Sequence, residues 1–147
     1  MDEEFMISDD PARLDPVAIH DYLSRSYWAP LETVRRSLAG SLCFGVYRGD
    51  RQVGFARVIT DRATYAYLCD VYILEEYQGR GLGSRLMREV MAHPDLQGLR
   101  RFSLVTRDAH DLYQPFGFRP VAEPGRHMEI VRPGIYRGGA GGGGVGS

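Results

Sequence analysis

The sequence contains no lysine and no asparagine, and all 18 of its basic residues are arginine. Without lysine, the chain cannot form a Schiff base through a lysine amine and cannot carry the lysine-containing phosphate loop of P-loop NTPases. Without asparagine, it has no acceptor for N-linked glycosylation. Because arginine stays protonated at neutral pH, any proton acceptor must be His, Asp, Glu, Tyr, Cys, water or a backbone group.

Long apolar runs and cysteine are also scarce. No stretch of 18 apolar residues occurs, so we expect no membrane span, and the acidic start of the sequence does not resemble a signal peptide. Cys43 and Cys69 lie in apolar runs typical of strands, which favours buried free thiols and a cytoplasmic location. The four histidines lack metal-ligand spacing, so we expect no metal.

The net charge of −1 favours neither nucleic acid nor a membrane as a partner. The arginines are unevenly distributed, because six of them lie between Gly79 and Arg107 against two acidic residues. This stretch is either a solvated face or the surroundings of an anionic ligand.

Hydrophobic periodicity predicts an α+β protein with α/β/α layers around a mixed central sheet. Strands are expected at 5–8, 42–47, 52–60, 64–74 and 101–106, with further extended segments at 117–118 and 127–131. Helices are expected from Asp15 to about Ser24, over 31–38, over 82–92 and over 108–113, where Asp108 is the expected N-cap. These elements predict one domain over 1–137 and a flexible glycine-rich tail over 138–147.

A glycine-rich turn, Gln78-Gly79-Arg80-Gly81-Leu82-Gly83-Ser84, separates the longest predicted strand from a predicted helix. It is not a dinucleotide-binding fingerprint, because Ser84 stands where the third glycine is needed. Backbone amides that open a helix can instead surround a pyrophosphate, and residues without Cβ at 81 and 83 let its oxygens approach. A simple glycine-rich turn is the alternative interpretation.

Residues 78–83 match the Q/R-x-x-G-x-G/A signature of the GNAT superfamily of N-acetyltransferases. The segment Asp108–Phe118, with Leu112-Tyr113 and Phe116-Gly117-Phe118, also resembles this family. The resemblance covers roughly residues 40–131. It implies a GNAT-like acyl-CoA N-acyltransferase fold, with the sheet splayed at the cofactor site. It also implies transfer of the acetyl group of acetyl-CoA to the primary amine of a small molecule, by direct attack in a ternary complex and without a metal.

The same resemblance implies how acetyl-CoA is held. The backbone of the long strand would pair with the pantetheine arm, and the loop amides would hold the pyrophosphate with help from arginine side chains. The cofactor-binding residues implied are Tyr72, Ile73, Leu74, Gln78, Gly79, Arg80, Gly81, Leu82, Gly83, Ser84 and Arg85.

Two residues are the candidates for catalysis. Tyr113 occupies the position of the family tyrosine that donates a proton to the CoA sulfur, although it is also compatible with a core residue. The position of the family's strand glutamate holds Tyr67 here, and the nearest acid is Asp70, nominally on the opposite face. A bulge can re-aim Asp70 to act as the base; the alternatives are an ion pair with Arg57, a role in acceptor binding, or a base that is water.

The acceptor site is expected to use Tyr27, Trp28, Arg57 and Tyr67, with Arg25, Phe55 and Tyr65 as further candidates. Such an aromatic lining favours a compact amine. Because the strand glutamate and a family asparagine near residue 108 are missing, a non-catalytic acyl-CoA sensor is one alternative, and a protein or peptide N-acetyltransferase is another. Both a monomer and a homodimer are compatible with the sequence.

Overall fold

The computed structural model describes residues 4–136, so the predicted tail over 138–147 lies outside the described residues. Within them, one sheet contains β1 (Phe5–Ser8), β2 (Leu42–Arg48), β3 (Arg51–Thr60), β4 (Tyr65–Ile73) and β5 (Arg101–Leu104), side by side in sequence order. The pairs from β1 to β4 are antiparallel and β4–β5 is parallel, which confirms the predicted mixed sheet.

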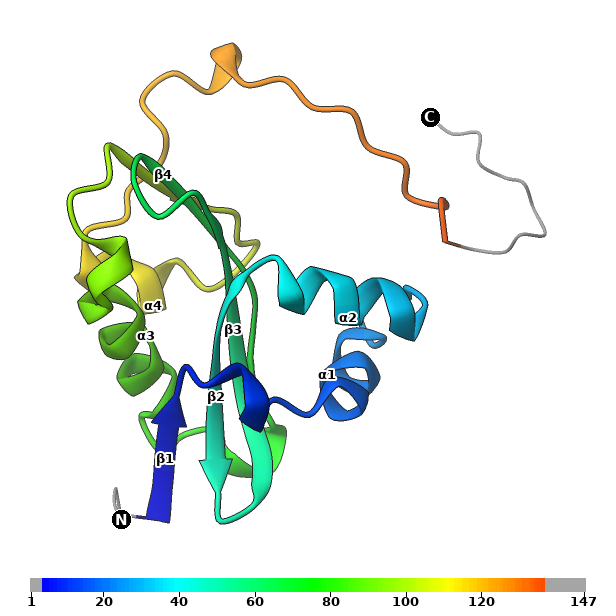
Figure 1. Ribbon diagram of the computed structural model, residues 1–147. Helices are drawn as coiled ribbons and strands as arrows, with labels where there is room; N and C mark the ends of the chain where they lie inside the picture. Colours follow the sequence, from blue (N-terminus) through cyan, green and yellow to red (C-terminus); the bar gives the residue numbers. More distant parts are fainter. Residues whose placement is uncertain (1–3, 137–147) are drawn as a thin grey trace.

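Helices cover both faces of this sheet (Figure 1). Helices α1 (Pro16–Leu23) and α2 (Leu31–Ala39) lie on one face, and α3 (Leu82–Ala92) and α4 (His110–Tyr113) lie on the other. Asp15 begins α1 as predicted, because its carboxylate accepts the Ala18 N–H at 3.1 Å. Two apolar clusters result, one centred on Ile19 and Phe55 and the other on Leu86 and Met87.

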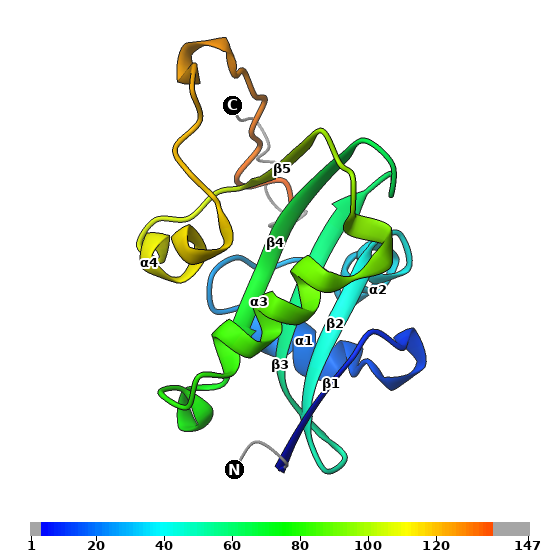
Figure 2. The ribbon, with the colours of Figure 1, turned by 90° about the vertical axis from the view of Figure 1, so that its left-hand side faces the viewer.

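Two predicted features of the C-terminal region are wrong. Asp108 is not the N-cap of the short helix, because α4 begins at His110 and the Oγ1 of Thr106 accepts the N–H of Ala109 at 3.0 Å. The segments 117–118 and 127–131 form no strand. Instead, the chain turns through Pro124–Arg126 and runs beyond the sheet, and within residues 4–136 it pairs with no strand there (Figures 1 and 2).

The described part of the chain can be searched for a membrane span and for a metal site. Among residues 4–136, no helix is long and apolar enough to cross a membrane. In the same range, no group of three His, Cys, Asp or Glu side chains is arranged to hold a metal ion.

Candidate active site

The sheet splays between β4 and β5. The two strands pair only from Tyr65 opposite Arg101 to Leu68 opposite Leu104, while β4 continues to Ile73. On that side the second half of β4 has no strand partner among residues 4–136, which confirms the splayed sheet.

The open edge of β4 can be assigned residue by residue. Leu74 donates its N–H to the Val53 carbonyl at 2.9 Å, so its amide faces β3 and is already engaged. Because successive peptide groups of a strand point to opposite edges, Ile73 and Val71 direct their N–H groups to the open edge. The Ile73 carbonyl is already engaged, because it accepts a hydrogen bond from Gln78. An extended ligand that carries amide groups can pair there as an added strand. The direction of the amides favours Ile73 among the predicted residues and adds Val71, which the sequence analysis missed because the strand register was unknown. The pairing of Tyr72, Ile73 and Leu74 with the pantetheine arm stays a prediction.

A bulge in β4 determines where Asp70 points. The β3–β4 register shifts between the pair Phe55–Tyr72 and the pair Arg57–Cys69, which leaves one extra residue in β4. Asp70 has a φ of 55°, a left-handed conformation that aspartate tolerates better than most residues. The bulge that the sequence analysis considered for Asp70 is therefore present, and it changes the direction of the Asp70 side chain.

The re-aimed Asp70 is held by an ion pair. Arg57 Nε donates to Asp70 Oδ2 at 2.8 Å, and the two side chains are only 14% and 12% exposed. Arg57 also donates to the Oγ of Ser41 at 3.1 Å, a partner that no sequence pattern indicated. The second carboxylate oxygen, Oδ1, lies 3.4 Å from the Tyr27 hydroxyl. The pair with Arg57, one of the alternative interpretations, is thus observed.

The glycine loop leaves three amides open at the start of α3. Gly79 and Gly81 have φ values of 81° and 79°, and Gly81 is the N-cap with no side-chain hydrogen bond to the helix. The first intrahelical bond joins the Arg85 N–H to the Gly81 carbonyl at 3.0 Å. Within residues 4–136, the preceding amides of Leu82, Gly83 and Ser84 have no acceptor. Together with the positive end of the helix dipole, they form an anion-binding site.

The two loop glycines differ in their local constraints. Gly81 has open space where a Cβ would be, so its left-handed φ is the reason for glycine. A Cβ on Gly83 would meet the side chain of Leu112 at 3.7 Å, which is an ordinary van der Waals contact, so packing alone does not require glycine there. Access of phosphate oxygens to the backbone at position 83 stays a prediction.

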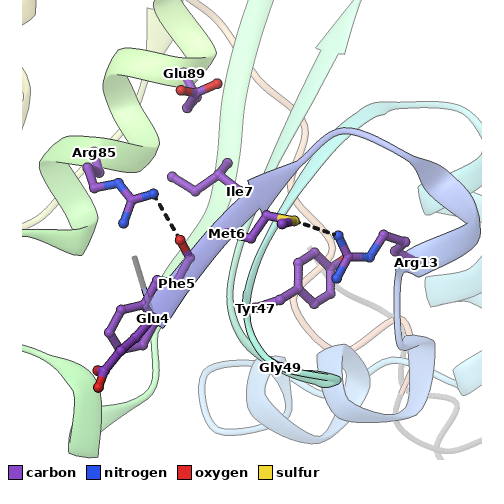
Figure 3. A pocket seen from close by; sticks show the side chains of 9 residues that line it. All are labelled: Glu4, Phe5, Met6, Ile7, Arg13, Tyr47, Gly49, Arg85 and Glu89. Carbon is purple, nitrogen blue, oxygen red and sulfur yellow. Dashed lines mark hydrogen bonds between the residues drawn. The ribbon is translucent and has the colours of Figure 1, made fainter. Parts of the chain in front are cut away.

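Side chains near the loop have other partners in the chain. Gln78 Nε2 donates to the Ile73 carbonyl at 2.8 Å, which fixes the loop to the end of β4. The Arg80 guanidinium lies over the rings of Phe5 and Tyr77. Arg85 donates to the Phe5 carbonyl at 3.1 Å, as Figure 3 shows. Both arginines thus contact β1, and their predicted phosphate contacts stay predictions.

Tyr113 lies beside an open cavity of about 1500 Å³. Its side chain is 8% exposed, and its ring meets Phe118 edge-on at a centroid distance of 6.1 Å. Burial raises the pKa of Tyr113 above the usual tyrosine range, so its hydroxyl remains protonated and available as a donor. Both interpretations of Tyr113, core residue and proton donor, fit this position.

The predicted acceptor residues divide into two groups. Tyr27 lies at Asp70, and burial, with the Asp70 charge adding to it, raises the pKa of its hydroxyl to about 12. Tyr67 lies two residues before Cys69, the strand partner of Arg57, and therefore shares its face of β4, so we group Tyr27, Arg57, Tyr67 and Asp70 as one cluster. Trp28 is half-exposed and packs edge-on against His20.

The three further candidates are placed differently. Phe55 is fully buried in the apolar core, so its predicted place in the acceptor site is wrong. Arg25 pairs with Glu75 at 2.9 Å, and Tyr65 is exposed at the start of β4.

Both cysteines are free thiols, as predicted. They occupy the register positions on either side of Arg57, Cys43 on β2 and Cys69 on β4. Burial raises the pKa of Cys43 to about 12 and that of Cys69 to about 11. Neither is therefore a thiolate at neutral pH, and neither serves as a nucleophile there.

Comparison with known proteins agrees with this geometry. Residues 39–120 match the family model of the acetyltransferase (GNAT) domain. A Gibberella zeae protein named as an acetyltransferase is 38% identical over 136 residues, which cover 75% of this chain and 76% of that protein. A crystal structure from Xanthomonas campestris pv. campestris, assigned to the GNAT family, is 52% identical with a TM-score of 0.87, and covers 91% of this chain and 97% of its own.

A third similarity is more local. The thialysine N-epsilon-acetyltransferase of Sus scrofa is 36% identical over 61 residues, which cover 39% of this chain and 36% of that enzyme.

Proposed function

This chain belongs to the GNAT family of acetyltransferases, and from that membership we propose that it transfers the acetyl group of acetyl-CoA to the primary amine of a small molecule. The observation that carries the proposal is the open edge of β4 next to the uncapped start of α3. The first suits the amides of a pantetheine arm, and the second suits a pyrophosphate.

The acceptor class follows from the cluster around Asp70. Oδ2 of Asp70 is held by Arg57, whereas Oδ1 has only the long contact to Tyr27. An incoming amine therefore competes with a single weak interaction for this oxygen. Asp70 binds the amine and takes its proton, directly or through water, and the aromatic residues Tyr27 and Tyr67 limit the acceptor to a compact molecule. The Sus scrofa enzyme named for the ε-amine of thialysine supports a small aliphatic amine.

The remaining residues act on acetyl-CoA. Acetyl-CoA supplies a thioester carbonyl for attack and a sulfur leaving group. The open amides of Leu82, Gly83 and Ser84 hold its pyrophosphate, and Ile73 and Val71 align the pantetheine arm. The amine attacks the carbonyl directly while both substrates are bound, and Tyr113 donates its proton to the departing sulfur. With both thiols protonated by burial, the chain offers no cysteine for a covalent acetyl-enzyme. The same unpaired thiols support our placing the protein in the cytoplasm.

The test is an acetyl-transfer assay on the intact protein. Release of CoA thiol is followed with a panel of aliphatic amines, including thialysine, arylamines and peptides with a free N-terminus. We expect turnover with at least one small amine and acetylation of that amine by mass spectrometry. Because the chain has no lysine, acetylated lysine side chains of the enzyme cannot contribute to the signal.

Two results would overturn the proposal. Turnover with peptides alone would make the protein a peptide N-acetyltransferase. Calorimetric binding of acetyl-CoA without turnover on any acceptor would make it a non-catalytic acyl-CoA sensor.

A further inference from the structure

The ends of β3 and β4 that meet at the turn 61–64 form a surface that extends beyond the acceptor cluster. β2 begins at Leu42, which lies opposite Val58, so the β3–β4 pair continues past the start of β2. Figure 1 shows this end of the two strands extending past α2. Two large side chains are exposed there, Ile59 at 44% and Tyr65 at 42%. Single exposed apolar residues are ordinary, so their meaning depends on their neighbours.

The strand register places both residues on the face that carries the acceptor cluster. Ile59 lies opposite Tyr67, two positions along from the pair of Arg57 with Cys69, and the register between these pairs is regular. Tyr65 is two residues before Tyr67 on β4. Because the side chains of a strand alternate between its two faces, these three side chains project on the same side as Arg57. Ile59, Tyr65 and Tyr67 are called here the aromatic strip.

The aromatic strip begins next to Asp70, the residue proposed to bind the amine. Tyr67 lies about 7 Å along the strand from Cys69, and Tyr65 lies about 13 Å from it. Asp70 follows Cys69 directly, and its carboxylate accepts from Arg57 on the face of the strip. The carbon chain of an amine held at Asp70 Oδ1 can therefore extend over Tyr67 and then along the strip.

A positive charge at the far end of the strip disfavours a cationic substituent. β5 pairs with β4 so that Arg101 lies opposite Tyr65, and the two residues share one face of the sheet. Arg101 is exposed, and among residues 4–136 no acidic side chain pairs with it. A second ammonium group on the ligand would meet this guanidinium, so the strip fits a neutral substituent.

We propose that the aromatic strip holds a neutral ring of the acceptor, which makes the acceptor an arylalkylamine, a primary amine joined to an aromatic ring by a short carbon chain. The ring packs on Tyr67 and Ile59 by stacked or edge-on contacts, and Tyr65 borders its far side. The amine group lies at Asp70. This inference rests on the proposed function, and it names Ile59 and Tyr65 as residues that determine which amine is acetylated.

The direct test compares three primary amines in the acetyl-transfer assay on the intact protein. They are 2-phenylethylamine, propylamine, which lacks the ring, and 1,5-diaminopentane, which carries a charge in place of the ring. We expect kcat/KM for 2-phenylethylamine to exceed that for each of the other two by at least about tenfold. An equal or higher kcat/KM for propylamine overturns this inference and leaves the proposed acetyl transfer intact.

Substitutions in the strip show where the ring binds. Ile59→Ser and Tyr65→Ser should each lower the ratio of kcat/KM for 2-phenylethylamine to kcat/KM for propylamine by at least about fivefold. The intrinsic reactivities of the two amines cancel in this comparison. Val17→Ser, a matched polar change at an exposed residue of α1, should leave the ratio unchanged. If the strip variants change only the melting temperature, the strip serves the fold alone and the inference is wrong.

A binding measurement separates this inference from the proposed function. In the presence of CoA, which has no acetyl group to transfer, calorimetry should show tighter binding of 2-phenylethylamine than of propylamine. Ile59→Ser should reduce this difference. If no amine is acetylated but the preference remains, the proposed function fails while the strip is still a site for an arylalkylamine. Equal affinities for the two amines overturn the inference whether or not acetylation occurs.

Discussion

At the scale of single residues, the proposed reaction depends on the hydroxyl of Tyr113 as the proton donor to the sulfur of CoA. We expect Tyr113→Phe to lower kcat by about 10²–10⁴-fold, the usual contribution of a positioned proton donor. The KM for acetyl-CoA should change little, because the phenyl ring keeps its contact with Phe118. Steady-state kinetics measure both values, and Tyr136→Phe, an exposed tyrosine outside the site, serves as the control.

The pH profile gives a second measurement on the same residue. Burial raises the pKa of Tyr113, so the donor form persists at alkaline pH and is lost only above the usual tyrosine range near 10. The rate should therefore not decline between pH 7 and about 10 through loss of this proton. An unchanged rate for Tyr113→Phe would instead assign Tyr113 to the core alone.

The ion pair between Arg57 and Asp70 is a further single-residue feature with a measurable energy. Asp70→Asn keeps the size of the side chain and tolerates the left-handed φ, but it leaves the largely buried guanidinium of Arg57 without its anion. We expect this substitution to lower the free energy of unfolding by about 3 kcal/mol. Because Arg57→Gln removes the stranded charge, the double variant should be less destabilised than the sum of the two singles, by about 1–3 kcal/mol.

Urea denaturation of the unmodified protein, the two single variants and the double variant measures the energetic coupling between Arg57 and Asp70. Additive effects would show that the two groups do not support each other. The same variants separate structure from catalysis, because Asp70→Asn should also lower kcat/KM for the amine. Arg57→Gln leaves the carboxylate in place and should mainly reduce stability.

At the scale of elements, the start of α3 depends on a backbone conformation. Gly81 has a φ of 79° with open space around it, and Gly49 in the β2–β3 turn has a φ of 60° with equally open space. Alanine at either position costs about 1–2 kcal/mol of left-handed strain. Only Gly81→Ala should disturb the amides of Leu82, Gly83 and Ser84, and we expect it to weaken acetyl-CoA binding at least about tenfold, or 1.4 kcal/mol.

Calorimetric titration measures the dissociation constant of acetyl-CoA for each variant. Gly49→Ala is the matched control, because it introduces the same backbone strain away from the loop. Equal affinities in the two variants would show that the loop amides do not hold the phosphates.

Some helices and strands could be predicted from the sequence alone, and others could not. The apolar runs of β2 and β3 and the helical spacing of Leu82, Leu86 and Val90 were sufficient to predict those elements, because these strands are largely buried on both faces and the three helical residues are buried. The bulge at Asp70 was foreseen only as a possibility, since strand register is set by partners distant in the sequence. Asp108 was predicted as the cap of α4 from its residue type alone, whereas the helix begins one residue later than expected, after Ala109.

Residues 127–131 illustrate a different limit. Their composition is that of a strand, and the prediction of an extended segment followed from it. A strand needs a neighbour, however, and within residues 4–136 no strand pairs with this segment. The local pattern therefore predicts an extended segment, but it does not supply the hydrogen-bond partner that a strand requires.

For the whole molecule, the proposed cofactor site links ligand binding to stability. A ligand that binds only the folded chain adds about 2.7 kcal/mol of stability at a hundred times its dissociation constant. For a chain of this size, that raises Tm by about 5–10 °C. Scanning calorimetry with and without acetyl-CoA measures the shift. At one fixed acetyl-CoA concentration, Gly81→Ala should give a smaller shift than Gly49→Ala, because only the first substitution lies at the start of α3. A Tm that acetyl-CoA leaves unchanged in the unmodified protein would contradict cofactor binding at this site.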